Sequence, residues 1–141
     1  LGEAPPGLLA ALGTYGSLLG RAFQLRDDIL GVFGDPEATG KPAGDDIREG
    51  KRTLLVLTAL ENGDARQHDT LDSLLGTPGL TEEDLTTARE IIEATGARNS
   101  CEELIARSTT DALTALEGAD MDAEGRSALI TLAGLATDRD R

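Results

Sequence analysis

An apolar stripe with helical spacing lies near the start of the chain. Its members recur at steps of four and three residues, and they are Leu18, Ala22, Leu25, Ile29 and Val32. This period places them on one face of an α-helix. We expect that helix to run from about residue 8 to residue 33, after an entry formed by Pro5, Pro6 and Gly7. The stripe therefore predicts a long amphipathic helix that packs one face against a core.

The composition of the whole chain favours the same class of structure. Only three of the 141 residues are aromatic, whereas leucine and alanine dominate, and this composition favours helix over strand. An apolar content of 39% is sufficient for a core. We therefore expect an all-α protein, an antiparallel helical bundle, with residues 1–141 in a single domain.

Glycine, proline and capping residues predict where the elements end. Residues 34–36 (Gly-Asp-Pro) end the first helix, and residues 35–50 are typical of a loop. Residues 53–60 are apolar on all sides and predict a buried helix, although periodicity alone leaves a strand open. Residues 81–84 resemble a capping box. The further helices that we expect span residues 65–75, 81–95, 97–117 and 124–137, with a turn at residues 76–79.

Charge and composition also exclude several classes of function. The net charge of −13 opposes general nucleic-acid binding, which needs a basic surface. Cys101 is the only cysteine, and no segment resembles a signal peptide or a membrane span. We therefore expect a cytoplasmic protein that does not span a membrane. Because the chain begins at Leu1 and its only methionine is Met121, we expect it to be part of a longer product.

Two adjacent aspartates lie on the polar side of the first predicted helix. Asp27 and Asp28 are three and four residues after Gln24, so the three side chains share one helical sector. Adjacent carboxylates repel each other unless a cation or a shared proton relieves them, and hard oxygen ligands suit Mg²⁺. A pair of aspartates by itself is more often a solvated helix face.

The residues that follow the aspartate pair favour a binding site. Both lysines of the chain, Lys41 and Lys51, flank a glycine-rich loop, and residues 21–52 hold six of the thirteen basic residues. Magnesium held by one or two carboxylates completes its coordination with water and phosphate oxygens, and lysines neutralise the remaining phosphate charge. The pattern therefore indicates a site for magnesium and a diphosphate.

This part of the chain also has a specific spacing of residue types. The segments that carry it are Phe23-Gln24-Leu25-Arg26-Asp27-Asp28-Ile29-Leu30-Gly31, Gly34-Asp35-Pro36, Thr39-Gly40-Lys41, Gly44-Asp45-Asp46-Ile47 and Gly50-Lys51-Arg52-Thr53-Leu54. Together they resemble the second aspartate-rich region of the trans-isoprenyl diphosphate synthases, the family of farnesyl, geranylgeranyl and longer polyprenyl synthases. The resemblance implies the isoprenoid synthase fold, of which this chain would form the carboxyl-terminal part.

The resemblance implies a Mg²⁺-dependent condensation of an allylic diphosphate with isopentenyl diphosphate. Asp27 and Asp28 would bind Mg²⁺, and Asp46 matches a position near the same metal. Asp27, Asp28 and Lys41 would be catalytic, because metal and lysine stabilise the diphosphate that leaves as the carbon–oxygen bond ionises.

The resemblance also implies four residues that contact substrates. Lys41 and Lys51 would contact the allylic diphosphate directly. Gln24 would line the allylic site near that diphosphate, and Phe23 would pack near the hydrocarbon of isopentenyl diphosphate. The nearby aspartates at positions 35 and 45 are expected to shape or cap turns instead.

Two departures from the family pattern limit these expectations. The family's usual Asp-Asp-x-x-Asp has Gly31 at its third position here, which predicts weaker affinity for the third metal ion. The first aspartate-rich motif, the arginines that bind isopentenyl diphosphate and the Lys-Thr pair of the preceding helix are missing from this sequence. We therefore expect an incomplete domain that is inactive alone and belongs to a homodimer in the complete enzyme.

Two other functions stay open at this point. A chain without the first aspartate-rich motif would be a non-catalytic partner subunit of a prenyl synthase, or a non-functional remnant of one. A terpene cyclase of the same fold is disfavoured by the Gly40-Lys41 and Gly50-Lys51-Arg52-Thr53 elements. His68 is expected to be a surface residue, and Cys101 a small core residue.

Overall fold

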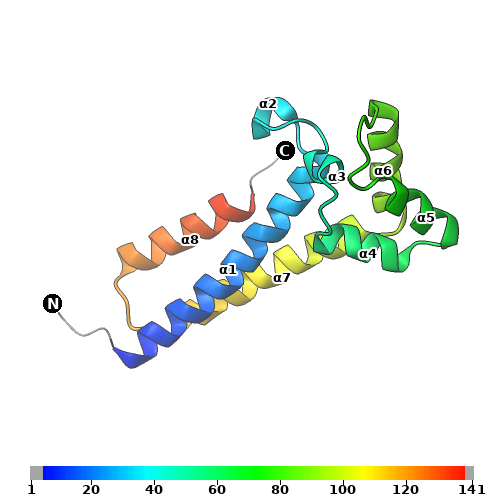
Figure 1. The fold of residues 1–141 in the computed structure, drawn as a ribbon. Helices are drawn as coiled ribbons and strands as arrows, with labels where there is room; N and C mark the ends of the chain where they lie inside the picture. The colour runs from blue at the N-terminus through cyan, green and yellow to red at the C-terminus, as the bar shows by residue number, and fades with distance from the viewer. Residues whose placement is uncertain (1–4, 139–141) are drawn as a thin grey trace. The chain divides into compact units, whose positions relative to one another are not determined.

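The computed structural model describes residues 5–138, and this range contains α-helices, turns and loops but no strand (Figure 1). The fold class expected from the composition is confirmed. None of the described helices is long and apolar enough to cross a bilayer. The helices are α1 (Pro6–Phe33), α2 (Pro36–Thr39), α3 (Asp45–Arg48), α4 (Leu54–Asn62), α5 (Ala65–Leu74), α6 (Glu82–Ala94), α7 (Ala97–Glu117) and α8 (Ala123–Thr137).

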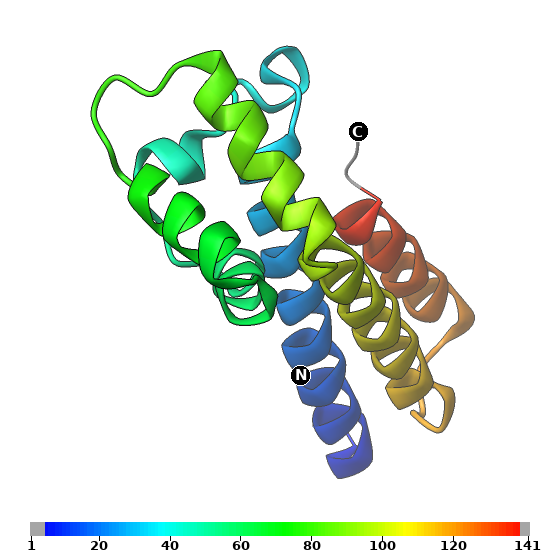
Figure 2. The same ribbon diagram turned by 90° about the vertical axis from the view of Figure 1, so that its right-hand side faces the viewer.

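The chain divides into two compact units, and each is described by itself. The first unit contains the described residues up to Arg26 and those from Leu104 onward, and the second unit runs from Asp27 to Glu103. In the first unit, the early part of α1, the later part of α7 and α8 lie side by side in antiparallel order (Figures 1 and 2). Its buried core consists of Tyr15, Leu19, Ala112, Leu116 and Ala133.

Two side chains of α1 donate hydrogen bonds to carbonyls of α8 and stabilise the first unit. The Tyr15 hydroxyl donates a hydrogen bond to the Leu129 carbonyl at 2.7 Å, so the only tyrosine both fills the core and links α1 to α8. Arg26 Nε donates to the Thr137 carbonyl at 2.8 Å, at the last residue of α8. Carbonyls at a helix end have no partner within the helix, and this guanidinium satisfies one of them.

The second unit is built on α4, α5 and α6, which pack against one another. Each of these helices begins at a residue whose side chain accepts a backbone hydrogen bond: Thr53 for α4, Asp64 for α5 and Thr81 for α6. The capping box predicted at Thr81 is confirmed, because the Asp84 side chain in turn accepts from the Thr81 backbone N–H at 2.9 Å. The largest fully buried side chains of the second unit are Val32, Ile47, Leu55, Val56, Leu71, Leu85, Ile92 and Cys101.

The loop predicted for residues 35–50 is wrong in part, because it contains α2 and α3. Asp35 begins α2, since its carboxylate accepts from the Glu37 N–H at 2.9 Å, and Gly40 ends it with a φ of 68°. The turn role expected for Asp35 is therefore confirmed. Asp45 does not cap the next turn as expected, because Gly44 occupies the N-cap position and Asp45 is the first residue of α3.

The helix predicted for residues 53–60 is confirmed as α4, but it is not buried on all sides. Leu54 and Leu57 are 42% and 44% exposed, whereas Leu55, Val56 and Ala59 are fully buried. The run is apolar throughout, so the sequence did not show which of its faces would pack inward.

Candidate functional site

The aspartate pair lies on the last turns of α1, within the second unit. Asp28 is buried, with 7% of its surface exposed, and Asp27 is half-buried. Gly31 follows these residues at spacings of four and three, so all three positions share one face of the helix. This turn of α1 therefore presents two carboxylates and then a position with no side chain.

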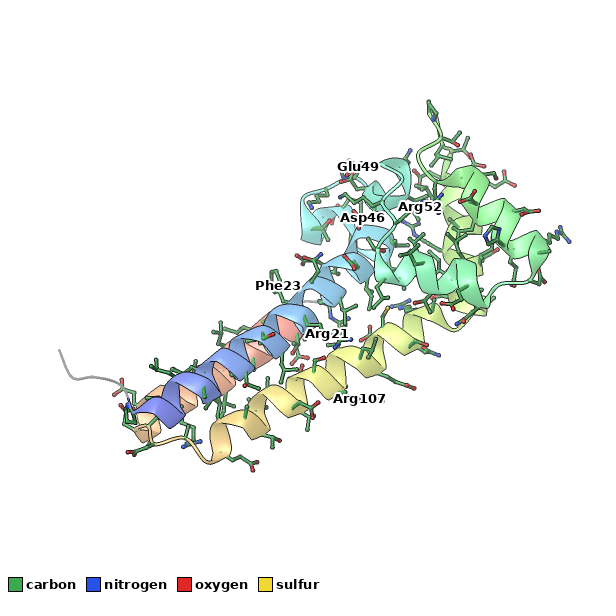
Figure 3. All side chains as sticks on the ribbon, turned by 60° about the horizontal axis from the view of Figure 1, so that its bottom comes forward. Arg21, Phe23, Asp46, Glu49, Arg52 and Arg107 are labelled. Atoms are coloured by element: carbon green, nitrogen blue, oxygen red, sulfur yellow. The ribbon has the colours of Figure 1, made fainter. Side chains whose placement is uncertain are left out.

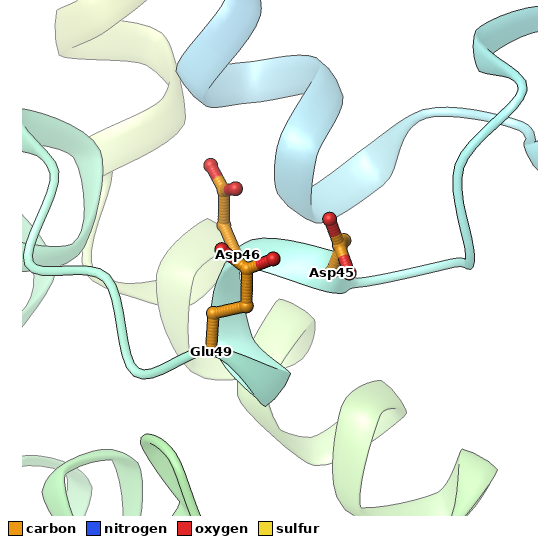
Figure 4. Close-up of side chains that lie close together, drawn as sticks. All are labelled: Asp45, Asp46 and Glu49. Carbon is orange, nitrogen blue, oxygen red and sulfur yellow. The ribbon is translucent and has the colours of Figure 1, made fainter.

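A second acidic group lies on and just after α3. Asp45, Asp46 and Glu49 each offer a carboxylate oxygen, and these oxygens lie within 4.8 Å of one another (Figure 4). The group includes Asp46, which the sequence singled out, but neither Asp27 nor Asp28. The sequence did not group Asp45 and Glu49 with Asp46, because residues 35–50 were predicted to be a loop and their i, i+4 spacing has meaning only on a helix.

Lys51 binds two carboxylates of this acidic group. Its Nζ lies 2.7 Å from Asp46 Oδ1 and 2.8 Å from Glu49 Oε2. The hydrogen bond with Asp46, followed by that with Glu49, raises the pKa of Lys51 well above its ordinary value. The ammonium is therefore firmly charged at neutral pH, and it offsets the repulsion between Asp46 and Glu49.

Lys41 lies in the turn after α2 and has an exposed side chain. Its backbone N–H donates to Thr39 Oγ1 at 3.3 Å, and no ion pair of its ammonium is found among the described residues. The pKa of Glu49 is lowered mainly by Lys51 and, to a smaller extent, by the charge of Lys41. Both lysines therefore act electrostatically on the same acidic group.

The arginines near the lysines have structural partners. Arg48 donates from Nε to the Ala43 carbonyl at 3.3 Å and from Nη1 to the Leu80 carbonyl at 2.9 Å. Its Nη2 also lies 3.0 Å from Glu82 Oε1 at the start of α6. Arg52 pairs with an aspartate of α5, Asp72, at 2.7 Å. These contacts hold the segment that carries Asp46 and Lys51 against α5 and α6.

Two glycines form a close backbone contact beneath the same segment. Gly50 and Gly76 have φ values of 68° and 69°, and the Gly76 N–H donates to the Ile47 carbonyl of α3 at 2.9 Å. A Cβ added at Gly50 would lie 3.0 Å from the Gly76 Cα. The turn predicted at residues 76–79 is thus confirmed, and it also anchors α3.

We expect Gly50→Ala to destabilise the chain more than Gly40→Ala. Both glycines have a φ of 68°, so each alanine carries the left-handed penalty of about 1–2 kcal/mol, but only the one at position 50 meets other backbone atoms. Overpacking there adds about 1–3 kcal/mol. Urea unfolding followed by far-UV circular dichroism measures both variants, and equal losses of stability would contradict the Gly50–Gly76 contact.

Phe23 and Gln24 belong to the first unit, on the part of α1 that precedes Arg26. Both side chains are exposed. Phe23 is one of the few large apolar residues of the described chain with an exposed side chain (Figure 3). Cys101 is buried and His68 is exposed, as the sequence predicted.

The donor atoms of the second unit fit a hard divalent cation. Asp27, Asp28 and Asp46 offer carboxylate oxygens, which are the ligands that Mg²⁺ prefers. The Asp46 carboxylate lies against Gly31, on the helical turn that follows the aspartate pair. Lysine ammonium groups next to such a cation are suited to phosphate oxygens. The second unit therefore has the donor set of a site for a cation and a phosphorylated ligand.

The chain combines an all-α fold with the donor set of a site for a cation and a phosphorylated ligand. A family model identifies the protein family to which this chain belongs. The polyprenyl synthetase model matches residues 1–92. The chain belongs to this family, whose members are prenyl diphosphate synthases. The family resemblance noted in the sequence is therefore confirmed.

Individual relatives agree with the family assignment. The chain is 37% identical over 143 residues to a short chain isoprenyl diphosphate synthase of Methanothermobacter thermautotrophicus, covering 99% of this chain and 42% of that protein. It is 46% identical over 91 residues to a geranylfarnesyl diphosphate synthase of Aeropyrum pernix, covering 64% of this chain and 27% of that protein. The chain thus spans less than half the length of these relatives.

A solved structure matches nearly the whole fold. Geranylgeranyl pyrophosphate synthase of Corynebacterium glutamicum, in complex with isoprenyl diphosphate and magnesium, superposes with a TM-score of 0.91 and 44% sequence identity. The match covers 96% of this chain and 39% of that one. The names of these relatives differ in product length, so they do not specify a product for this chain.

Proposed function

We propose that this chain supplies the second aspartate-rich half of a prenyltransferase that condenses an allylic diphosphate with isopentenyl diphosphate. The observation that supports this most directly is the arrangement in the second unit, where Lys51 holds Asp46 against Gly31, one turn beyond Asp27 and Asp28. Family membership supports the reaction class. The complete enzyme would be a homodimer.

Three carboxylates would hold the metal ion. Asp27 and Asp28 offer oxygens from α1, and Asp46 offers oxygens from α3, which suits the preference of Mg²⁺ for oxygen ligands. When bound, Mg²⁺ supplies positive charge that stabilises the oxygens of a leaving diphosphate. The half-exposed Asp27 is the most accessible of the three carboxylates.

The lysines would bind the diphosphate of the allylic substrate. Lys41 would donate hydrogen bonds from its exposed ammonium, and Lys51 would do so while Asp46 and Glu49 fix its position. As the carbon–oxygen bond breaks, the diphosphate leaves with the electron pair, and charged donors already in place stabilise it. The double bond of isopentenyl diphosphate then forms the new carbon–carbon bond, and loss of a proton restores a double bond.

Phe23 and Gln24 would contact the remaining parts of the substrates. Gln24 would line the allylic site near the diphosphate with its amide group, and Phe23 would pack against the isopentenyl hydrocarbon. Their exposure on α1 is consistent with contacts to a ligand.

A product assay on the full-length protein tests the proposal. Labelled isopentenyl diphosphate is incubated with an allylic diphosphate and Mg²⁺, and we expect a labelled, longer prenyl diphosphate. A chelator should abolish its formation and added Mg²⁺ should restore it. Diphosphate binding without product, measured by calorimetry, would favour the non-catalytic partner subunit. Absence of both binding and product would overturn the proposal.

A further inference from the structure

The last turn of α1, which follows the aspartate pair, has little support from its own sequence. Gly31 lies within this turn, and a glycine inside a helix lowers the stability of that helix. The turn has no basic side chain that could bind the carbonyls at the helix end. Gly34, which follows the helix, is not among the described glycines with a positive φ, so a left-handed glycine cap is absent as well. This end of α1 therefore depends on contacts from other helices.

Arg89 of α6 donates a hydrogen bond to the end of α1. Its Nε lies 2.8 Å from the carbonyl oxygen of Val32, which is among the last carbonyls of the helix. The residue four positions after Val32 is Pro36, which has no N–H to donate to this carbonyl. The guanidinium also brings positive charge to the negative end of the helix dipole. Arg89 thus caps α1 from a different helix.

Arg98, at the start of α7, contacts the last residue of α1. Its guanidinium carbon lies 4.4 Å from the centre of the Phe33 ring, within the range of a cation–π contact. Its Nη1 also lies 2.8 Å from Glu93 Oε1, so the guanidinium is held from a second side. The helix dipole disfavours a cation in the first turn of α7, so that helix does not itself explain this arginine. Two arginines therefore hold two successive residues at the end of α1.

Both contacts lie one turn beyond the carboxylates that would bind the metal ion. The residues that form them belong to the second unit, as Asp27 and Asp28 do. In an α-helix the N–H of Val32 donates to the carbonyl of Asp28, so the residue held by Arg89 is bonded to the backbone of the aspartate pair. Fraying of the last turn would break this bond and let the two carboxylates change direction.

We propose that Arg89 is a positioning residue for the metal site, which fixes the direction of Asp27 and Asp28 by capping the last turn of α1, and that Arg98 assists it. This inference rests on the proposed function. Neither arginine would contact the metal ion or the substrates. The alternative is that the two arginines contribute to stability alone, without an effect on the site.

Substitution of these arginines in the full-length protein tests the proposal. The affinity for Mg²⁺ in the presence of inorganic pyrophosphate is measured by calorimetry. Arg89→Met keeps the apolar stem but removes the donor, and we expect it to weaken this affinity about tenfold. Arg89→Lys should restore most of the affinity, because an ammonium can also donate to the Val32 carbonyl. Arg98→Met should weaken it about threefold, since cation–π contacts at exposed sites are weaker.

Arg126→Met is the matched control, because Arg126 also binds carbonyls at a helix end, but in the first unit. It donates from Nη2 to the Ala119 carbonyl at 2.8 Å and from Nη1 to the Leu116 carbonyl. Loss of Arg89 or of Arg126 should lower the urea midpoint, whereas only Arg89→Met should weaken Mg²⁺ binding.

Hydrogen exchange provides a second readout that needs no ligand. Arg89→Met should speed the exchange of backbone amides in residues 29–34, because the last turn of α1 would open more often. Arg126→Met should leave the exchange of these amides unchanged. Equal exchange at residues 29–34 in the wild type and in Arg89→Met would show that Arg89 does not hold this turn, which would overturn the inference.

The outcomes of the binding experiment separate the inference from the function on which it rests. A wild type that binds neither Mg²⁺ nor pyrophosphate would overturn the proposed function and this inference with it. Normal Mg²⁺ binding by Arg89→Met would overturn the inference alone. Equal losses of Mg²⁺ affinity in Arg89→Met and Arg126→Met would do the same, because general stability would then explain both.

The half-exposed Arg98 keeps the inference testable if Arg89→Met does not fold, as judged by circular dichroism. The Arg98 side chain is 39% exposed, so its loss should leave the chain folded. Unchanged Mg²⁺ affinity in Arg98→Met would then overturn the inference. A loss confined to the variants at positions 89 and 98, with recovery in Arg89→Lys, would support it.

Discussion

Asp27→Ala in the complete enzyme is expected to lower turnover by about 100-fold or more at saturating Mg²⁺. Asp27 lies on the metal-binding face of α1 in our proposal, and its loss would remove charge stabilisation from the departing diphosphate. It is a better test than Asp28, which is buried, because substitution of Asp28 would combine effects on folding and on function. Steady-state kinetics with varied Mg²⁺ provides the measurement.

A matched aspartate outside the site serves as the control. Asp111 is an exposed aspartate on α7, and Asp111→Ala should leave turnover and its Mg²⁺ dependence unchanged. Both variants lose one negative charge, so a general effect of net charge would appear in both. Near-normal turnover of Asp27→Ala at every Mg²⁺ concentration would show that Asp27 is not a metal ligand.

Leu85→Ala is expected to cause the largest loss of stability among single core changes near the site, about 2–5 kcal/mol. Leu85 is 1% exposed on α6, and its methyl groups pack against Gly44, where an added Cβ would lie 2.8 Å from Leu85 Cδ2. Its truncation would leave a cavity directly beneath the start of α3. The free energy of unfolding in urea measures the loss.

Leu57→Ala is the control for this change, because Leu57 is a leucine on α4 that is 44% exposed. Less apolar surface is lost there and no closed cavity forms, so we expect a loss of about 1 kcal/mol or less. Equal losses for the two variants would mean that Leu85 does not support α3 as the structure indicates.

The long helices were predictable because their signals are local. The prediction of residues 97–117 coincides with α7, and that of residues 81–95 lies within one residue of α6 at each end. The capping box at Thr81 needed only residues within one turn. The four-residue helices α2 and α3 were missed because they are too short to show a period, and the glycines and prolines around them are typical of loops.

The residue types of the site were predictable, but the contacts between them were not. The family resemblance singled out Asp46 and Lys51, although their roles stay predictions. Nothing in the sequence indicated that Asp46 lies against Gly31, because that contact depends on how the chain folds back between α1 and α3. In the same way, the sequence showed only that Arg48 is one of the basic residues that follow the aspartate pair, whereas in the structure its guanidinium donates to the Ala43 and Leu80 carbonyls.

The unequal settings of the two lysines have a practical consequence for labelling. Acylating reagents attack a neutral amine, and the carboxylates of Asp46 and Glu49 keep the amine of Lys51 protonated, whereas no ion pair of Lys41 is found among the described residues. Under mild conditions an acylating dye should therefore attach at Lys41 before Lys51. Since these are the two lysines of the sequence, the ratio of label at Lys41 to label at Lys51, measured by peptide mass spectrometry, reports the difference between their surroundings.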